Sequence, residues 1–192
     1  GLPFYALQLE ILANFCLGAL FMYLLARRLT RRRGSALLAA LAFTLGGYLT
    51  SYPPEQLPVL EGSIWLPLAL YFAHRATDLP GFRKPGRSVR LAWCGVALGM
   101  SILAGHPQVA MLTFYTTLLY LAYRAWRARI SLSPHLPISP VLLYPALAAL
   151  VGLGVGAIQW LPTAEFMGLS TRATITFAEV QAGFRPGALL SV

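Results

Sequence analysis

The side chains best suited to chemistry gather around one short turn, Gly105-His106-Pro107-Gln108. The apolar segments on either side, 91–105 and 107–123, are fifteen and seventeen residues long. As helices they would reach roughly 22 to 26 Å, which is less than the apolar core of a bilayer. The turn should therefore lie below the membrane surface, where irregular backbone is found only inside protein or beside a water-filled cavity. This depth makes His106 and Gln108 candidates for substrate binding, although His106 can equally satisfy the backbone of a neighbouring segment.

Acidic side chains supply a second group of candidates. Glu10 and Asn14 stand one helical turn apart and so share a face. A carboxylate inside a bilayer must face the bundle interior, and hydrogen bonding between helices is the simpler role for this pair. Glu61 lies four residues before Trp65, near the outer mouth of an apolar segment, and Glu55 precedes the same segment. A tryptophan in such a place most often anchors a helix at the membrane interface.

The tail carries an acid and a base seven residues apart. If Pro162 starts a helix, Glu165 and Arg172 fall on one side of it, two turns apart. Arg172 and Arg185 are the cations expected on the outer face, so they are candidate partners for a phosphate group there. The alternative is that each is a surface or interfacial arginine. Residues 176–179 (Thr-Phe-Ala-Glu) match a capping box and predict another short outer helix.

Long apolar segments must position these side chains. The chain is 57% hydrophobic and 11% charged, whereas a soluble domain has roughly 25% charged residues. We predict an all-α fold, a polytopic transmembrane helix bundle over residues 1–162 with an extracytoplasmic tail, 163–192, that holds the short outer helices. The predicted spans cover about residues 4–26, 35–52, 57–73, 91–105, 107–123 and 141–161.

Two finer features of these spans follow from their small residues and prolines. Pro67 predicts a kink in the third span. Gly152 and Gly156 stand four residues apart in the sixth span and predict a face for close helix packing.

The arginines predict the orientation of the bundle. Thirteen of the fifteen Lys and Arg residues fall in three clusters between the spans: Arg27, Arg28, Arg31, Arg32 and Arg33; Arg75, Arg83, Lys84, Arg87 and Arg90; Arg124, Arg127 and Arg129. Basic residues that flank a span are retained in the cytoplasm during insertion. The arginine-rich loops are therefore predicted to be cytoplasmic, and the His106 turn, the N-terminal end and the tail 163–192 extracytoplasmic.

Composition also argues against other classes of protein. A net charge of +9 would suggest nucleic acid in a soluble protein, but here the basic residues sit at helix ends, where the lipid bilayer attracts them. No nucleic-acid-binding pattern and no metal-ligand spacing is present. Cys16 and Cys94 lie inside apolar spans and are interpreted as packing residues. The first residues lead straight into an apolar run without an initiator Met or a signal-peptide pattern, so we expect an internal piece of a larger protein.

Several motifs together resemble the YfhO family of bacterial multi-pass membrane proteins. They appear in order along nearly the whole chain: Tyr23-Leu24-Leu25-Ala26-Arg27-Arg28-Leu29, Gly46-Gly47-Tyr48-Leu49, Trp65-Leu66-Pro67-Leu68, Ala104-Gly105-His106-Pro107-Gln108, Gln159-Trp160-Leu161-Pro162-Thr163-Ala164-Glu165 and Leu169-Ser170-Thr171-Arg172. That family is similar to the GT-C glycosyltransferases. The resemblance implies a protein of the bacterial cytoplasmic membrane that takes a sugar from a polyprenyl-phosphate donor and transfers it to an extracytoplasmic glycan or teichoic-acid-type acceptor.

The resemblance also implies site residues, and one departure matters. Enzymes of the GT-C type usually carry an essential acid, commonly Asp, in the first extracytoplasmic loop, and no outward Asp occurs here. The catalytic acid is therefore expected upstream of this piece. Glu55, Glu61 and Glu165 remain candidates to orient substrate or to hold a divalent cation. His106, Gln108, Glu165 and Arg172 are the expected cavity residues, with Arg172 near the donor phosphate.

Two other functions stay open. The intramembrane polar residues Glu10, Asn14 and His106 are also typical of a transporter or flippase of lipid-linked or envelope precursors, although no internal repeat supports that function. A non-enzymatic membrane scaffold for envelope assembly is the third hypothesis.

Overall fold

Every element that the computed structural model describes is a helix. The description covers residues 4–51, 56–78, 86–132 and 139–170, and no strand lies in these ranges. In chain order the helices are α1 (Phe4–Thr30), α2 (Arg33–Thr44), α3 (Gly47–Ser51), α4 (Leu57–Ser63), α5 (Trp65–Thr77), α6 (Arg87–Leu103), α7 (Pro107–Leu132) and α8 (Ser139–Leu169). The predicted all-α class is confirmed.

Three of the described helical segments are long and apolar enough to cross a membrane. They are Tyr5–Thr30, Arg33–Ser51 and Val141–Leu169. Membrane-length apolar helices were the basis of the predicted bundle, so this coarser prediction is supported. The number of six spans stays a prediction.

The third predicted span is divided where the sequence predicts a kink. Helix α4 ends at Ser63 and α5 begins at Trp65, so the break falls just before Pro67. Proline has no backbone N–H, and the carbonyl group of Ser63 therefore lacks its usual partner four residues later. In the preceding turn, the Ser63 hydroxyl group donates to the carbonyl oxygen of Val59 at 2.6 Å. The break between the two helices thus falls at Ile64, three residues before Pro67.

Pro162 does not start a helix, contrary to the expectation for the tail. Helix α8 continues through it to Leu169, because one missing N–H removes a single bond from an otherwise apolar helix. The hydroxyl group of Thr163 donates to the carbonyl oxygen of Gln159 at 2.7 Å in the same turn. The capping box at 176–179 lies outside the described residues.

The chain forms two compact units, Gly1–Ala157 and Ile158–Val192. The predicted division at residue 162 stays a prediction. All helices up to the first part of α8 belong to the first unit, and the last turns of α8 belong to the second.

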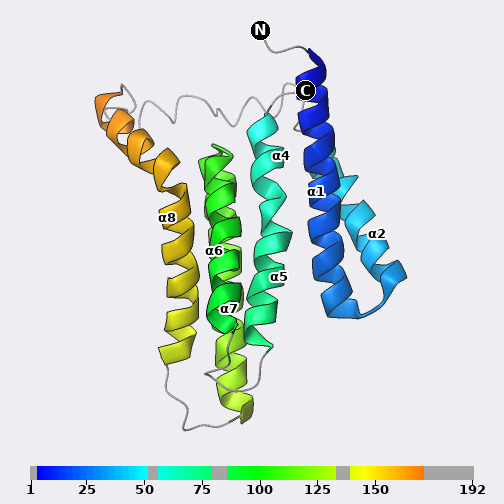
Figure 1. The fold of residues 1–192 in the computed structure, drawn as a ribbon, viewed down its shortest axis with the longest axis vertical. Helices are drawn as coiled ribbons and strands as arrows, with labels where there is room; N and C mark the ends of the chain where they lie inside the picture. Colours follow the sequence, from blue (N-terminus) through cyan, green and yellow to red (C-terminus); the bar gives the residue numbers. More distant parts are fainter. Residues whose placement is uncertain (1–3, 52–55, 79–85, 133–138, 171–192) are drawn as a thin grey trace, which may run out of the picture. The chain divides into compact units, whose positions relative to one another are not determined.

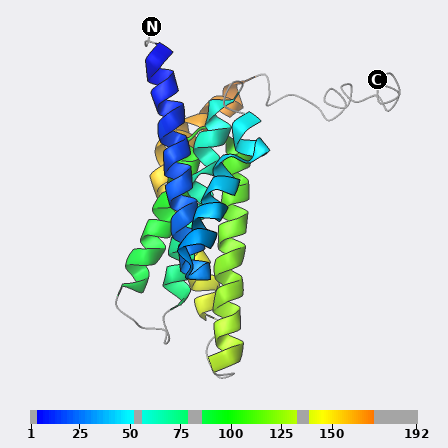
Figure 2. The ribbon, with the colours of Figure 1, turned by 90° about the vertical axis from the view of Figure 1, so that its right-hand side faces the viewer.

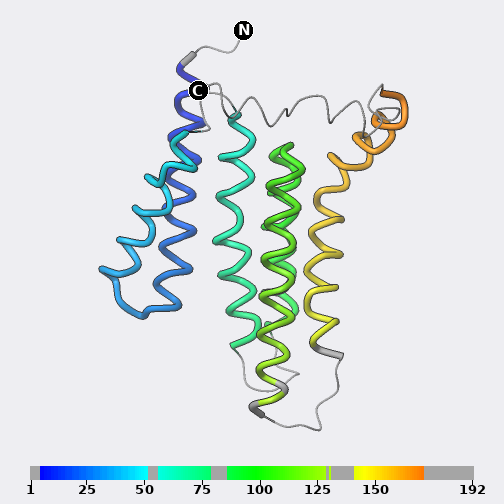
Figure 3. Tube along the Cα trace, turned by 180° about the vertical axis from the view of Figure 1, so that it is seen from behind, coloured from blue at the N-terminus to red at the C-terminus, as the bar shows by residue number. Residues whose placement is uncertain are grey.

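Within the first unit, α5 and α6 form the centre. Helices α1 and α7 both contact α5, and α7 also contacts α6 (Figures 1 and 3). Helix α2 lies along α1 (Figure 2). The main core cluster joins α5, α6, α7 and α8, and its buried residues are Ala69, Ala73, Ala76, Leu91, Cys94, Ala97, Leu98, Leu121, Ala125, Tyr144 and Ala148.

Small residues let α6 and α8 approach closely, as the sequence predicts. A Cβ atom added at Gly156 would lie 2.6 Å from Ile102, and one added at Gly95 would lie 2.5 Å from Val151. At Gly154, two residues from Gly152 and from Gly156, an added Cβ meets nothing within 4 Å. The predicted packing face is confirmed, and α6 supplies a matching glycine of its own.

Candidate functional site

The turn between α6 and α7 is built by three residues in succession. Gly105 adopts a left-handed backbone (φ +80°) that closes α6. His106 then caps α7, since its Nδ1 accepts a hydrogen bond from the Val109 N–H at 3.4 Å. Pro107 occupies the first helical position, where its missing N–H costs nothing. His106 therefore does satisfy a backbone N–H group, and that group belongs to α7, the helix that it caps.

This capping bond leaves the other ring nitrogen of His106 available. A neutral imidazole accepts at one nitrogen and donates from the other. Because Nδ1 accepts from Val109, the proton is assigned to Nε2. The half-buried His106 side chain can thus cap α7 and donate a hydrogen bond to a ligand at the same time.

His106 and Gln108 line one small polar pocket. Its volume is about 130 Å³, and its walls come from α3, the start of α4 and the α6–α7 turn. The lining residues are Tyr48, Gln56, Val59, His106, Gln108, Val109 and Leu112. Hydroxyl, amide and imidazole groups converge here, which suits a ligand rich in hydroxyl groups. We call this end of the first unit, with Tyr48, Gln56, His106 and Gln108, the histidine end.

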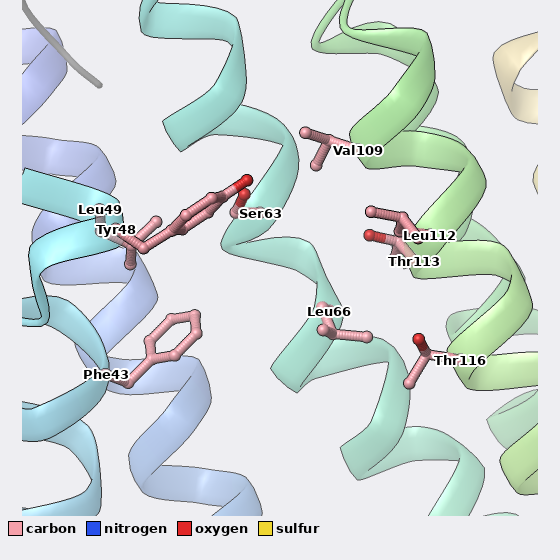
Figure 4. Close-up of a pocket in the computed structure, with 9 residues that line it drawn as sticks. All are labelled: Phe43, Tyr48, Leu49, Ser63, Leu66, Val109, Leu112, Thr113 and Thr116. Atoms are coloured by element: carbon pink, nitrogen blue, oxygen red, sulfur yellow. The ribbon is translucent and has the colours of Figure 1, made fainter. Parts of the chain in front are cut away.

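An apolar groove adjoins the polar pocket. It has a volume of about 250 Å³ and shares Tyr48, Val109 and Leu112 with the pocket. Figure 4 shows the Tyr48 ring reaching over the groove with its hydroxyl toward Ser63. The remaining lining residues are Phe43, Leu49, Leu66, Thr113 and Thr116. A molecule with a polar head and an apolar chain could place one part in each compartment.

Glu10 and Glu61 form a pair that the sequence does not predict. The Glu61 side chain of α4 lies close to that of Glu10 in α1. Two carboxyl groups that lie side by side can share one proton, as in other paired acids. The interhelical hydrogen bond expected for Glu10 stays a prediction, and the Asn14 side chain donates within its own helix, to the Glu10 carbonyl oxygen at 3.0 Å.

The other predicted site residues lie elsewhere. Glu165 is exposed on α8 in the second unit. Glu55 and Arg172 lie outside the described residues, as does Arg185. Within the described ranges no group of three or more His, Cys, Asp and Glu residues could hold a metal ion, so no cluster there supports the expected divalent cation.

The cysteines do not share one environment. Cys94 is buried in the core, as predicted for a packing residue. Cys16 is exposed on α1, so its interpretation as a packing residue is wrong. Neither forms a disulfide in the described structure.

A second polar cluster lies at the opposite end of the first unit, around Asp78. Its carboxylate contacts Arg28 of α1 at 2.9 Å, His74 of α5 at 3.1 Å and Arg124 of α7 at 2.5 Å. The Tyr120 hydroxyl lies 2.6 Å from His74 Nδ1. We call this the arginine end, with Arg28, His74, Asp78, Arg87 and Arg124. These contacts bring members of all three arginine clusters or their flanking helices to one end, as predicted.

The surroundings of His74 favour its neutral form. It lies one residue beyond the predicted span 57–73, and burial lowers its pKa below the usual value. Asp78 opposes this shift, while Arg124 and Arg28 add to it. The neutral ring satisfies both neighbours, with Nε2–H donating to Asp78 and Nδ1 accepting from Tyr120. The pKa is lowered overall because burial, together with the positive charges of Arg124 and Arg28, outweighs the attraction of Asp78.

Two arginines of α6 close the end of α5. Arg87 is buried, and its Nε donates to the Ala76 carbonyl oxygen at 2.9 Å while Nη1 donates to the Tyr144 hydroxyl at 2.6 Å. Arg90 donates to the Arg75 carbonyl oxygen at 2.8 Å. The last carbonyl groups of a helix lack partners within it and favour positive charge. These arginines therefore have a structural role.

Comparison of the chain with protein-family models, with curated proteins and with solved structures finds no match in any of the three. The resemblance to the YfhO family thus stays a prediction from the motifs. The fold defines the class only as an all-helical protein with membrane-length apolar helices.

Proposed function

We propose that this chain is part of a membrane glycosyltransferase of the YfhO type, related to the GT-C enzymes. It would transfer a sugar from a polyprenyl-phosphate-linked donor to an extracytoplasmic envelope acceptor. The observation that carries the proposal is the polar pocket joined to an apolar groove. A lipid-linked sugar has the same two parts, a hydroxyl-rich head and a hydrocarbon chain.

Each pocket residue has a role in this proposal. His106 donates from Nε2 and Gln108 from its amide group to hydroxyl groups of the sugar or acceptor. Tyr48 stands where pocket and groove meet, so it would contact the junction between head and chain. Arg172 remains the proposed partner of the donor phosphate.

The proposed location is the bacterial cytoplasmic membrane, crossed six times. The histidine end and the tail 163–192 would face outward, and the arginine-rich loops the cytoplasm. The gathering of basic side chains around Asp78 supports this orientation, because basic residues that flank spans favour the cytoplasmic side.

A transfer assay with the full-length protein tests the proposal. The His106→Ala and Gln108→Ala variants should each lose about five- to tenfold in sugar transfer from a polyprenyl-phosphate donor, the loss expected for one ligand hydrogen bond. Gln8→Ala changes an exposed glutamine of α1 and should leave transfer unchanged. Full activity in both pocket variants would contradict the site assignment.

One observation favours the transporter or flippase instead. Glu10 and Glu61 lie close together inside the predicted spans, and intramembrane acids often carry protons in transporters. Movement of a lipid-linked sugar across proteoliposomes, without transfer to an acceptor, would support that function over the glycosyltransferase.

A further inference from the structure

The arginines of the first unit divide into two sets with different surroundings. The first set is engaged within the protein. Arg87 and Arg90 bond to carbonyl groups at the end of α5, and Arg28 and Arg124 bond to Asp78. Their charges are therefore used to join helices.

The arginines of the second set are exposed at the surface of the first unit. Arg31, Arg32, Arg33 and Arg127 are exposed, and no side-chain partner for their guanidinium groups is found among the described residues. Asp78 is the only acid that the described structure has at this end, and three basic groups already contact it. We call Arg31, Arg32, Arg33 and Arg127 the outward arginines. Their positive charges are therefore open to an anionic partner.

The backbone at Arg31 supports a use for its side chain. Arg31 is the one described non-glycine residue with a positive φ, +58°. Two hydrogen bonds hold this turn: the Arg31 N–H donates to the Arg27 carbonyl at 3.1 Å, and Arg27 Nη1 donates to the Arg31 carbonyl at 3.2 Å. Glycine adopts this conformation without strain. An arginine at this position is uncommon, and such residues are found most often in turns and at functional sites.

The apolar residues beside the outward arginines identify the kind of partner. Leu29, Leu37 and Leu38 are exposed on α1 and α2, next to Arg31–Arg33. Trp126 and Ile130 are exposed beside Arg127 on α7. Exposed leucines and a tryptophan next to cations are typical of the membrane interface. A soluble anion or a nucleic acid would not cover the apolar part of this surface.

We propose that the outward arginines bind the phosphate headgroups of anionic phospholipids in the leaflet at the arginine end. Planar guanidinium groups match phosphate oxygens in bidentate geometry. The neighbouring apolar side chains would contact the acyl chains of the same lipids. This inference depends on the chain lying in a membrane, and not on the proposed sugar transfer.

Lipid retention by the purified full-length protein tests the proposal. The protein is placed in nanodiscs of phosphatidylcholine, with and without phosphatidylglycerol, and its bound lipids are read by native mass spectrometry. Wild type should keep phosphatidylglycerol and melt at a higher temperature when that lipid is present. The variant with Arg31→Gln, Arg32→Gln, Arg33→Gln and Arg127→Gln should lose both effects. The single variants Arg32→Gln and Arg33→Gln should show a partial loss, which keeps the test valid if the combined variant does not fold.

Arg87→Gln is the matched control, because it removes an arginine of the engaged set. It should lower the melting temperature in both lipid mixtures and keep the increase caused by phosphatidylglycerol. An increase that survives in the outward-arginine variants would overturn the proposal. So would an equal increase when inorganic phosphate is added to phosphatidylcholine nanodiscs, because the site would then bind free anions rather than lipids.

Discussion

The two ends of the first unit use polar side chains in opposite ways. At the arginine end they bond to one another across helices, and Asp78 alone contacts side chains from α1, α5 and α7. At the histidine end, His106 bonds to its own helix and shares a pocket with Gln108. The charged side chains of the Asp78 cluster are thus bonded within the protein, whereas the outward arginines beside it are exposed.

This difference shows why charge density is a poor guide to the functional site. Paired charges in a bundle hold helices together, and their bonding capacity is already used. Polar groups that line a pocket retain capacity for a ligand. The histidine end, with fewer charges, is therefore the better candidate for binding a substrate.

The close contact between α6 and α8 should be the most sensitive to substitution, because α6 connects the two ends. Helix α6 begins at the arginine end and leads into the His106 turn, and it packs closely against α8. Gly95→Ala would place a Cβ 2.5 Å from Val151 and 2.7 Å from the Ala148 carbonyl oxygen. Overpacking of this kind should lower stability by about 2 to 3 kcal/mol. Thermal unfolding of the detergent-solubilised protein measures it.

Gly154→Ala is the control for this prediction. An added Cβ there meets nothing within 4 Å, and alanine favours a helix over glycine by up to about 1 kcal/mol. Its melting temperature should stay level or rise. Equal losses in the two variants would show that the α6–α8 contact is not a close one.

Removal of the Asp78 carboxylate at the arginine end should cost more than removal of the Glu61 carboxylate in α4. Asp78→Asn leaves Arg28 and Arg124 without a carboxylate. Since the Asp78 side chain is 26% exposed, the loss should be about 1.5 kcal/mol, between the values for exposed and buried ion pairs. Glu61→Gln should lower the melting temperature less, because an amide can still bond to Glu10. A larger loss of stability in Glu61→Gln than in Asp78→Asn would contradict this expectation.

The arginine end should also lose stability in mild acid. Burial lowers the pKa of His74 in the folded protein, so the unfolded chain binds a proton first as the pH falls below about 6.5. Stability should therefore decrease as the pH falls from about 6.5 toward the lower folded pKa, and stay level above it. Melting temperatures across this range measure the effect.

His74→Gln should flatten that pH dependence, since glutamine does not titrate. Arg28 and Arg124 face the ring from α1 and α7, so a proton on His74 would add a third positive charge beside Asp78. An unchanged slope in the variant would assign the acid sensitivity to another group.

The smallest expected effect concerns the strained turn. Arg31→Gly should raise stability by about 0.5 to 1 kcal/mol in neutral lipid, because a left-handed backbone is costly for side chains other than glycine. The same variant should retain less phosphatidylglycerol. Arg32→Gly, at a residue with extended backbone (φ −107°), should not gain stability. A gain in stability at both positions would show that the left-handed backbone of Arg31 is not the reason for the gain.

Much of the fold was predictable because long apolar segments leave few alternatives. The predicted spans 4–26 and 91–105 correspond to α1 and α6. Helix ends were harder to predict. The span predicted over 107–123 lies within α7, which continues through the basic stretch to Leu132, because arginine is a good helix former.

The site was predictable only where its residues are neighbours in the sequence. His106 and Gln108 belong to one turn and do share a pocket. Tyr48 and Gln56 join them from α3 and the start of α4, which no local pattern indicates. The pairing of Glu10 with Glu61 likewise depends on how α1 packs on α4. Thr113 and Thr116, which line the groove, did have a pattern in the sequence. Two hydroxyl groups three residues apart in an apolar helix lie on one face.

The central claim is that the histidine end is the working end and faces the outside of the cell. Labelling of intact cells with a membrane-impermeant thiol reagent tests it most directly, in full-length protein with Cys16→Ser and Cys94→Ala. Gln108→Cys should be labelled in intact cells, whereas Arg32→Cys should be labelled only after lysis. Labelling of Arg32→Cys in intact cells, with Gln108→Cys protected until lysis, would contradict the account.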